Sequence, residues 1–248
     1  MWNVKDKTVL VTGATSGIGY ETALGLAKQG ARVTIVGRNA EKTARVVAEL
    51  EAKSGAKVAY VLGDLSLLRE VREVARRFLE QHDTLHLLVN NHGVIMTTRA
   101  LTAEGHEVTF ATNHLSVQLL TTLLLPALKK AGTARVVTVS SGIHPIGRIH
   151  FDDLTLTRGY GPFKAYAQSK LANILFTQEL AKRLEGTGVT ANCLHPGFVG
   201  SNFAYRPGVL GAVGHWFTTT FGKSPEKGAA TSLFLATSDA VSAVTGGY

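Results

Sequence analysis

The chain has 248 residues, of which 45% are hydrophobic and 18% charged, a composition typical of a globular domain and unlike that of a disordered or collagen-like chain. Its 26 lysines and arginines outnumber its 18 aspartates and glutamates, and the resulting net charge of +8 favours an anionic partner. The most apolar run, residues 119–128, is shorter than the ~20 residues of a membrane-spanning helix and contains Pro126, so the sequence predicts no membrane span.

Short apolar, β-branched runs alternate along the chain with longer stretches of helical periodicity. The runs are nearly continuous in hydrophobic residues, as expected for strands covered by helices on both faces. Predicted strands are residues 8–11, 32–36, 57–62, 85–89, 135–139 and 189–194. Predicted helices are residues 21–29, 40–53, 67–81, 104–130 and 166–184. This alternation predicts an α/β fold of the Rossmann type, with a doubly wound parallel sheet flanked by helices.

No linker rich in proline or serine divides the chain, so we expect a single domain over residues 1–248. Two segments, 142–165 and 198–227, interrupt the alternation. Ligands of open α/β sheets bind beyond the carboxyl ends of the strands, where such long connections lie. We therefore expect residues 198–227, with Leu210, Trp216, Phe217 and Phe221, to form an apolar substrate loop or lid. The alternative is a surface loop whose aromatic side chains pack onto the body.

A glycine-rich turn follows the first predicted strand and precedes a helix. Glycines permit a tight turn and a close approach of the backbone to a phosphate, and the helix N-terminus offers free N–H groups. Three glycines alone are a weak signal, but this strand–turn–helix context supports a dinucleotide site. The residues predicted to hold its pyrophosphate are Gly13, Thr15, Ser16, Gly17, Ile18 and Gly19.

The second predicted strand ends in Val36-Gly37-Arg38-Asn39, which contains an arginine and no acid. NAD-binding units place an acidic residue here to bind the ribose 2′-hydroxyl, whereas a guanidinium pairs with a 2′-phosphate. The sequence therefore predicts NADP(H), with Arg38 on the 2′-phosphate. The alternative is a solvated arginine at a strand end.

Polar turns follow the third and fourth predicted strands. Asp64 and Leu65 stand where a chain reversal would bring them to the adenine, although Asp64 alone would be interpreted as a helix N-cap. The turn Asn90-Asn91-His92-Gly93 closes the fourth strand. Turns rich in asparagine are usually structural, so spacing alone assigns this one no function.

Four polar residues are candidates for the chemistry. Tyr166 and Lys170 share one helix face, and an ammonium beside a phenol is expected to lower the phenol pKa from about 10 toward neutrality. Ser141 follows the fifth strand, where its hydroxyl can hold a substrate oxygen. Asn113 lies inside a helical run, where asparagine is a poor helix former. The ordinary alternatives are a chance pair, a turn serine and a surface amide.

In this order and spacing, the features resemble the short-chain dehydrogenase/reductase family over nearly the whole chain. The family motif TGxxxGxG is present as residues 12–19, and Tyr-x-x-x-Lys as residues 166–170. The residues around Tyr166 and His195 are most similar to the retinol dehydrogenase and WW-domain oxidoreductase branch. Other matching positions are Asn90, Asn91, Gly93, Asn113, Ser141, Pro196 and Gly197.

The resemblance implies hydride transfer between NADP(H) and a carbonyl or alcohol carbon of a lipophilic substrate, such as a ketone, an aldehyde, a retinoid or a steroid. It implies that Tyr166 exchanges a proton with the substrate oxygen and that Ser141 polarises this oxygen. Lys170 would lower the pKa of Tyr166 and hold the ribose, and Asn113 would position a water. Implied cofactor contacts include Asn91, Gly93, Tyr166, Lys170, Pro196, Gly197 and Val199. A non-catalytic NADP-binding sensor and a protochlorophyllide-reductase-like enzyme are the alternatives.

Three departures from the family pattern stand out. His92 replaces the alanine of the family's Asn-Asn-Ala-Gly turn, and it would crowd the ribose or add a titrating group beside it. Ser116-Val117-Gln118 replaces the Gly-His-Phe of this branch, which makes retinoid specificity unsafe to carry over. The membrane-anchoring N-terminus of the branch is missing, which favours a soluble protein.

The remaining expectations concern location and partners. The single cysteine, Cys193, forms no internal disulfide, which favours a reducing cytoplasm. Arginines of the helix 67–81 alternate with glutamates, so we expect no nucleic-acid partner, and no metal site is predicted. The family implies a homodimer or homotetramer formed through the helices around Asn113 and Tyr166. The sequence ends at Gly246-Gly247-Tyr248, where the family begins its last strand, so an unpaired sheet edge is expected.

Overall fold

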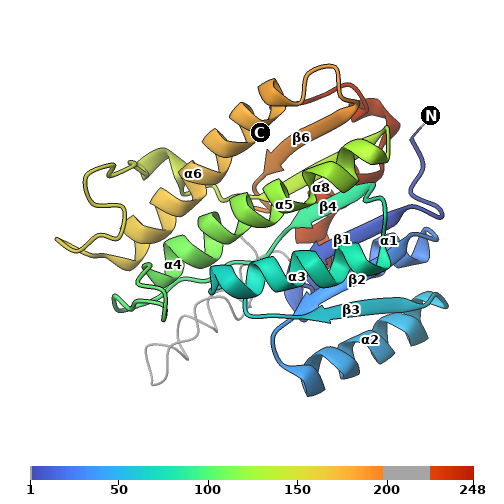
Figure 1. The fold of residues 1–248 in the computed structure, drawn as a ribbon, viewed down its shortest axis with the longest axis horizontal. Coiled ribbons are helices and arrows are strands. Elements are labelled where there is room, and N and C mark those ends of the chain that lie inside the picture. The colour runs from blue at the N-terminus through green and yellow to red at the C-terminus, as the bar shows by residue number, and fades with distance from the viewer. Residues whose placement is uncertain (1, 198–223) are drawn as a thin grey trace.

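The computed structural model describes residues 2–197 and 224–248. Within them, a 6-stranded parallel sheet has the order β3-β2-β1-β4-β5-β6 (Figure 1). The strand order reverses between β1 and β4, as in other doubly wound sheets, and the predicted fold class is confirmed. The strands are β1 (Thr8–Thr12), β2 (Arg32–Gly37), β3 (Val58–Leu62), β4 (Leu87–Asn90), β5 (Ala134–Val139) and β6 (Val189–Leu194).

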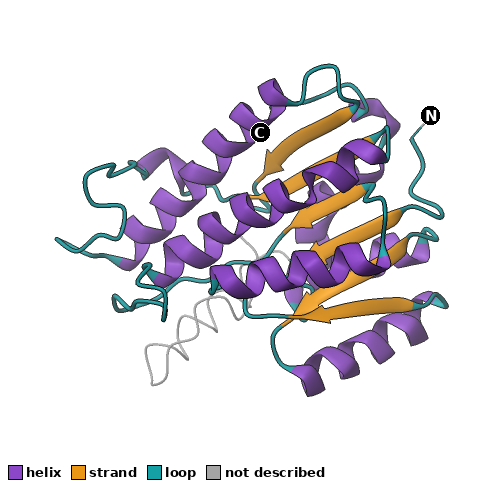
Figure 2. Ribbon diagram, viewed as in Figure 1, coloured by secondary structure: helices purple, strands orange, loops and turns teal. Residues whose placement is uncertain are grey.

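Helices cover both faces of this sheet (Figure 2). The helices α1, α2 and α8 pack on one face, and α3, α5 and α6 pack on the other. A π-helical turn, η1, joins α4 to α5. The bounds are α1 (Gly17–Lys28), α2 (Ala40–Ser54), α3 (Leu68–Gln81), α4 (Val108–Phe110), η1 (Ala111–Leu115), α5 (Ser116–Lys130), η2 (His144–Ile146), α6 (Pro162–Arg183), α8 (Pro225–Thr237) and η4 (Asp239–Val241).

The central strand β1 shows how one hydrophobic run serves two cores. Successive side chains of a strand point to opposite faces of the sheet. Val9 and Val11 pack in the cluster with α1, α2 and α8, whereas Leu10 packs in the cluster with α3, α5 and α6. All three side chains are fully buried. This two-sided burial is the physical reason that the strands of a parallel sheet lack a polar alternation.

One helix of the described chain, Val108–Lys130, is long and apolar enough to cross a membrane by length and composition alone. It comprises α4, η1 and α5, and 56% of its most apolar window is buried inside the protein. Leu120, Leu124 and Leu128 are fully buried in the cluster that this helix shares with α3 and α6. Core helices pass the same test, so the helix is weak evidence for a membrane span.

Helix boundaries differ from prediction for identifiable reasons. The helix α1 begins at Gly17 rather than at residue 21 because the glycine turn itself enters the helix. The helix α6 begins at Pro162 rather than at residue 166, since proline is well accepted in a first helical turn. The predicted helix 104–130 begins only at Val108, where the Glu107 carboxylate accepts bonds from two free backbone N–H groups. It is then interrupted by η1, which a 3.6-residue periodicity does not reveal.

Helix α8 is absent from the sequence prediction, which assigned residues 198–227 to a substrate loop. Residues 198–223, with Val199, Leu210, Trp216, Phe217 and Phe221, lie outside the described residues. The loop prediction is wrong for Pro225 and the two residues after it, because they form the start of α8. The N-cap Ser224 accepts a bond from the Lys227 backbone N–H at 3.3 Å. The sequence Ser-Pro-Glu at 224–226 is typical of a helix start.

Residues near 246 lie along the outer edge of β6. The backbone N–H of Gly246 donates to the Ala191 carbonyl at 2.7 Å, and that of Cys193 donates to the Gly247 carbonyl at 2.9 Å. The expectation of an unpaired edge is therefore wrong at these residues of β6.

Candidate active site

The polar residues singled out in the sequence gather beyond the carboxyl ends of the strands. Because the strands are parallel, these ends meet at one edge of the sheet. The glycine turn follows β1, Arg38 follows β2, Asp64 comes shortly after β3, Asn91 follows β4 and Ser141 comes shortly after β5. The fold thus brings together residues that are distant in sequence.

The three glycines of the first turn differ in what a side chain would meet at each position. Gly13 has a φ of +66°, and a Cβ there would stand 2.7 Å from the Cα of His92. A Cβ on Gly19 would collide with the carbonyl oxygen of Gly13 and the side chain of Asn91. Gly17 has a φ of +58°, but no atom of residues 2–197 and 224–248 lies within 4 Å of the place of its Cβ. Gly13 and Gly19 therefore permit close packing, whereas Gly17 leaves open space.

The start of α1 offers backbone donors to an anion. The N-cap Ser16 is exposed, and its side chain makes no capping hydrogen bond. The first N–H groups of a helix lack intrahelical partners and carry the positive end of its dipole. Together with the open space at Gly17, bordered in sequence by Thr15 and Ile18, this arrangement fits a pyrophosphate.

The ends of β2 and β3 bring together two residues predicted to contact a nucleotide. Nη1 of Arg38 lies 3.5 Å from Oδ2 of Asp64, and 75% of the Arg38 side chain is exposed. Oδ1 of Asp64 accepts a bond from the Ser66 backbone N–H at 2.9 Å. The Leu65 side chain is buried in the core, so only its backbone remains for a nucleotide contact.

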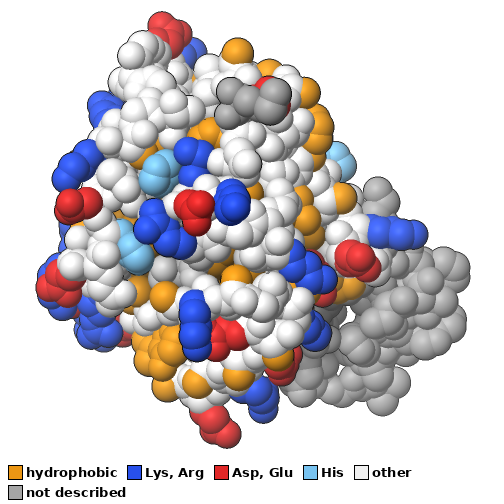
Figure 3. Space-filling view, turned by 90° about the vertical axis from the view of Figure 1, so that its right-hand side faces the viewer, with side chains coloured by type: hydrophobic (Ala, Val, Ile, Leu, Met, Phe, Trp, Pro, Cys, Tyr) orange, Lys and Arg blue, Asp and Glu red, His pale blue; other side chains and the backbone are white. Residues whose placement is uncertain are grey.

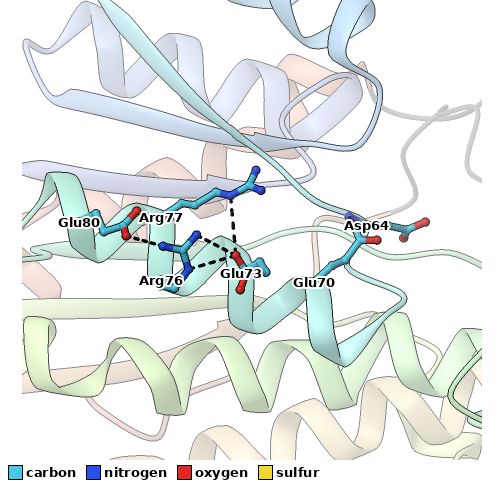
Figure 4. A network of polar contacts seen from close by, with 6 residues as sticks. All are labelled: Asp64, Glu70, Glu73, Arg76, Arg77 and Glu80. Atoms are coloured by element: carbon cyan, nitrogen blue, oxygen red, sulfur yellow. Dashed lines mark hydrogen bonds and ion pairs between the residues drawn. The ribbon is translucent and has the colours of Figure 1, made fainter.

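The charged side chains of α3 pair with one another rather than form a basic stripe (Figure 4). Nη2 of Arg76 lies 2.9 Å from Oε2 of Glu73, and its Nη1 bonds Glu80. Nε of Arg77 lies 3.9 Å from the same Glu73 oxygen. On the face shown in Figure 3, lysines and arginines are also interspersed with acidic side chains. Among the described residues, α3 therefore carries no uninterrupted basic stripe.

The turn after β4 fastens the glycine turn to the sheet. Nδ2 of Asn91 donates to the carbonyl oxygens of Thr12 at 3.1 Å and Gly13 at 3.2 Å. The Asn91 backbone N–H donates to Oγ1 of Thr12 at 3.0 Å. Asn91 is therefore committed to shaping the glycine turn, and Gly93 lies half-buried in the same segment.

His92 lies in this turn with 8% of its surface exposed. Its Nδ1 lies 2.7 Å from Oγ1 of Thr12, and its Nε2 lies 2.7 Å from Oγ of Ser116. Burial and the nearby charge of Lys170 lower the pKa of His92 from 6.5 to about 3, so the ring is neutral. His92 is therefore not the titrating group that was expected beside the cofactor. It is a buried neutral ring with a hydrogen-bond partner at each nitrogen.

Asn113 lies in the π-helical turn η1 and is fully buried. Its Oδ1 accepts a bond from the Val94 backbone N–H at 2.7 Å, and its Nδ2 donates to the Val94 carbonyl at 2.9 Å. Nδ2 also donates to Oγ of Ser169 at 3.0 Å. The surface-amide alternative is thus wrong, because Asn113 connects the turn after β4 to α6. Both N–H groups of the Asn113 side chain donate hydrogen bonds within the protein, so only an oxygen of Asn113 remains to contact a water.

Tyr166 and Lys170 lie on one face of α6, with Nζ of Lys170 5.5 Å from the centroid of the Tyr166 ring. Lys170 is buried, and its Nζ donates to the carbonyl of Val139 at the end of β5, at 2.9 Å. Ser141 comes shortly after β5, and its hydroxyl hydrogen-bonds with the Tyr166 phenol. The structure therefore places a hydroxyl, a phenol and an ammonium at one edge of the sheet.

The electrostatics of this group differ from the expectation. Burial raises the pKa of Tyr166 to about 12, and the hydrogen bond with Ser141 opposes this rise. Burial lowers the pKa of Lys170 to about 8. The expected fall in the phenol pKa is not found because loss of hydration dominates and the Lys170 ammonium is directed at the Val139 carbonyl. Tyr166 is therefore a protonated phenol at neutral pH.

The surroundings of Ser141 include residues from the last part of the chain. The Tyr248 hydroxyl donates to the Ser141 carbonyl at 3.2 Å. Pro196 and Gly197 follow β6 at the same edge of the sheet and are half-buried. Gly197 has a φ of +80°, and its N–H donates to Nδ1 of His195 at 3.3 Å. These contacts shape the side of the site next to β6.

Comparison with known proteins identifies the arrangement. The short chain dehydrogenase family matches residues 7–206, which contain the glycine turn, Asn113, Ser141, Tyr166 and Lys170. The chain belongs to the short-chain dehydrogenase/reductase family. It is 43% identical over 243 residues to retinol dehydrogenase 11 of Homo sapiens, a match that covers 98% of this chain and 76% of that protein. It is 44% identical over 246 residues to retinol dehydrogenase 12 of Mus musculus, covering 99% and 78%.

Solved structures give the same family assignment. An uncharacterised protein of Mycobacterium paratuberculosis has a TM-score of 0.77 at 37% identity, over 96% of this chain and 79% of that one. A protein described as an NAD(P)-dependent gluconate 5-dehydrogenase of Beutenbergia cavernae, with bound NADP at low occupancy, has a TM-score of 0.77 at 30% identity. That match covers 99% of this chain and 94% of the other. This short-chain dehydrogenase/reductase is therefore an oxidoreductase that acts on alcohol or carbonyl groups.

Several polar partners in this short-chain dehydrogenase/reductase were missed from the sequence. Ser116 bonds His92, and Asn173 donates from its Nδ2 to the Asn113 carbonyl at 2.8 Å. Nδ1 of His114 lies 3.0 Å from Oδ1 of Asn173. Asn173 lies on α6 within the turn that follows Lys170, and a polar residue on the buried side of a helix was the available signal.

Proposed function

We propose that this chain is an NADP(H)-dependent reductase or dehydrogenase that interconverts a lipophilic carbonyl compound and its alcohol. The observation that supports this most is the placement of Ser141, Tyr166 and Lys170 at the sheet edge that also carries the uncapped start of α1. The three side chains can transfer protons, and the start of α1 can bind an anion. Both face the end of the sheet where ligands of this fold bind.

The residues present fit a dinucleotide cofactor. Gly17 leaves open space at the start of α1, and the free N–H groups there suit the pyrophosphate. Arg38, at the end of β2, is proposed to hold a 2′-phosphate, and Lys170 is proposed to hold the nicotinamide ribose. Pro196, Gly197 and Val199 are proposed to line the nicotinamide. When bound, this cofactor supplies or accepts the hydride.

The proton chemistry belongs to the chain itself. Tyr166 is protonated at neutral pH, so its hydroxyl can donate a proton to a carbonyl oxygen that is becoming an alkoxide. The Ser141 hydroxyl can donate a hydrogen bond to the same oxygen and hold it against the phenol. The phenolate that remains is stabilised by the charge of Lys170 until a proton from solvent restores the phenol. In the direction of alcohol oxidation, the same groups act in reverse.

The preference for NADP(H) over NAD(H) is proposed from Arg38. The residues after β2 include no acid that would bind a ribose 2′-hydroxyl, and the exposed guanidinium can form paired bonds with a phosphate. The similar protein from Beutenbergia cavernae is described with bound NADP, which supports the proposal.

A lipophilic substrate is proposed from the relatives and from this chain's own residues. The curated relatives are named retinol dehydrogenases, and retinol is an apolar alcohol. The segment after Ser141 exposes apolar side chains, with 74% of Ile146 and 81% of Phe151 accessible. Retinoids, steroids and long-chain aldehydes or ketones are therefore the first substrates to test.

A screen for NADPH oxidation tests the proposal. The chain is incubated with NADPH and, in separate reactions, all-trans-retinal, a ketosteroid, a long-chain aldehyde and a small polar ketone. We expect turnover with at least one apolar carbonyl and a lower KM for it than for the polar ketone. Tight NADPH binding without turnover on any carbonyl or alcohol would favour the non-catalytic sensor instead.

Assembly and location are also proposals. A homodimer or homotetramer through α5 and α6 is supported by apolar side chains that α6 exposes, with 60% of Phe163 and 46% of Leu175 accessible. Analytical ultracentrifugation measures this directly. A cytoplasmic location is proposed from the single buried cysteine, Cys193, and fractionation of cells that express the protein tests it.

A further inference from the structure

Two departures from the family pattern, His92 and Ser116, contact each other in the folded protein. Nε2 of His92 lies 2.7 Å from Oγ of Ser116, and both side chains are buried. The family has an alanine in place of His92, and the related branch has a glycine in place of Ser116. Neither of those residues has a polar side-chain atom that could make this contact.

The direction of each hydrogen bond around the ring follows from the donors available. The Ser116 hydroxyl has one proton, which it donates to the Thr112 carbonyl at 2.6 Å. Its oxygen must therefore accept from Nε2–H of His92. Because the ring is neutral, Nδ1 carries no proton and accepts one from the Thr12 hydroxyl. The Thr12 hydroxyl has one proton and two acceptors within reach, Nδ1 of His92 at 2.7 Å and the Val89 carbonyl at 3.2 Å, and the shorter contact assigns the proton to Nδ1.

The ring therefore joins two parts of the site. Thr12 ends β1 and begins the glycine turn, where the pyrophosphate is proposed to bind. Ser116 begins α5, directly after the η1 turn that carries Asn113. Asn113 in turn bonds Ser169, the neighbour of Lys170 on α6. Hydrogen bonds, together with the backbone of η1 and of α6, thus link the glycine turn to the proton-transfer residues.

We propose that His92 is a positioning residue that sets the glycine turn through Thr12 and the Asn113 helix through Ser116. The inference rests on the proposed function, because its two effects are read as cofactor affinity and turnover. Each ring nitrogen serves one of the two parts. The two effects of His92 are therefore separable by substitutions that keep one polar atom and remove the other.

Two isosteric substitutions separate these effects. In His92→Asn, Oδ1 occupies the place of Nδ1 and can accept from Thr12, but no donor reaches Ser116. In His92→Gln, the side-chain N–H can reach Ser116, but no acceptor remains near Thr12. We expect His92→Gln to weaken NADPH binding by up to about tenfold with little loss of kcat. We expect His92→Asn to lower kcat by a similar factor with little change in NADPH affinity.

Further variants make the test specific. Ser116→Ala should reproduce the kcat loss of His92→Asn, and combining the two should add nothing, since both remove one contact. His86→Gln is the matched control, because His86 precedes β4 at the opposite end of the sheet and its Nδ1 accepts from the Thr8 backbone N–H. This control should change neither NADPH affinity nor kcat. Thermal melting of each variant shows that the fold is retained.

The results of these experiments distinguish a positioning role of His92 from a general packing role. Equal changes of affinity and kcat in His92→Asn and His92→Gln, or no change in either, overturn the inference, because a general packing role moves both quantities together. If the unaltered chain binds NADPH but reduces no carbonyl, the proposed function fails separately. In that case, amide hydrogen exchange of residues 111–116 replaces kcat, and faster exchange in His92→Asn than in His92→Gln is the expected result.

Discussion

The guanidinium of Arg38 and the carboxylate of Asp64 form an ion pair of 3.5 Å across the ends of β2 and β3. Asp64 thereby holds an exposed arginine at the position where we propose that a 2′-phosphate binds. Because guanidinium–phosphate bonds are charge-assisted, Arg38→Ala should raise the KM for NADPH by roughly 10–100-fold and leave the KM for NADH nearly unchanged. Steady-state kinetics with both cofactors measure this.

The control for Arg38 is Arg183→Ala, since the Arg183 side chain is also 75% exposed and also pairs with an acid, Glu179, but lies at the end of α6. It should leave both KM values unchanged. Equal losses for NADPH and NADH in Arg38→Ala would show that this residue does not recognise the 2′-phosphate.

Tyr166→Phe should retain NADPH affinity and lose turnover. The substitution removes the hydroxyl that is proposed to donate the proton while keeping the ring that faces Lys170. Loss of a positioned general acid costs about 10²–10⁴-fold in rate, so kcat should fall by at least this factor. Tyr60→Phe on the exposed side of β3 is the matched control and should keep full activity. Substantial carbonyl reduction by the Tyr166→Phe variant would show that the phenol is not the proton donor.

The rate of carbonyl reduction should fall above about pH 8. Burial lowers the pKa of Lys170 to about 8 and raises that of Tyr166 to about 12. As pH rises through 8, Lys170 therefore loses its charge while Tyr166 keeps its proton. A pH profile of kcat/KM should show a single falling limb near 8, and the remaining activity of Lys170→Arg should lack it because arginine stays charged. A limb near 10 in the unaltered chain would contradict the assignment.

His92 should make the fold less stable in acid. Its pKa is lowered from 6.5 to about 3 by burial. Between these two pH values, His92 is therefore protonated in the unfolded chain but neutral in the native chain. The free energy of unfolding should therefore be unaffected by His92 above pH 6.5 and fall below it, by at most about 1.4 kcal/mol per pH unit.

Urea unfolding at several pH values between 7 and 4 measures this effect. His92→Gln, which does not titrate, should lose less stability over that range than the unaltered chain. The buried His114, whose pKa is also lowered, is present in both proteins and cancels in the comparison. Parallel pH dependences would show that His92 is accessible to protons in the native state.

Gly17→Ala and Gly19→Ala should separate cofactor binding from folding. A methyl group at Gly17 meets no atom of the described residues, and its strain at positive φ costs only about 1–2 kcal/mol. It would project into the space proposed for the pyrophosphate, so NADPH affinity should fall much more than stability. A methyl group at Gly19 collides with the backbone of Gly13 and should mainly lower the melting temperature. Fluorescence titration and thermal melting distinguish the two results.

The sequence predicts the strands well because burial on both faces leaves continuous apolar runs such as 189–194, which the structure reproduces at both ends. It does not predict η1, because a π-turn inserts one residue without changing the local composition. The contact between His92 and Ser116 spans 24 residues, and no local pattern links an unusual histidine to an unusual serine. The raised pKa of Tyr166 depends on three-dimensional burial, which a spacing of Tyr and Lys on a helix does not contain.

The order of the strands also has a consequence for synthesis of the protein. β1 lies between β2 and β4, and Val9 pairs with Val33 on one side and with Leu87 on the other. While the ribosome is still making the residues before β4, one edge of the central strand β1 has no partner. Unpaired edges of this kind promote association between chains. The nascent polypeptide therefore carries this open edge of β1 throughout translation of α3, until β4 pairs with β1.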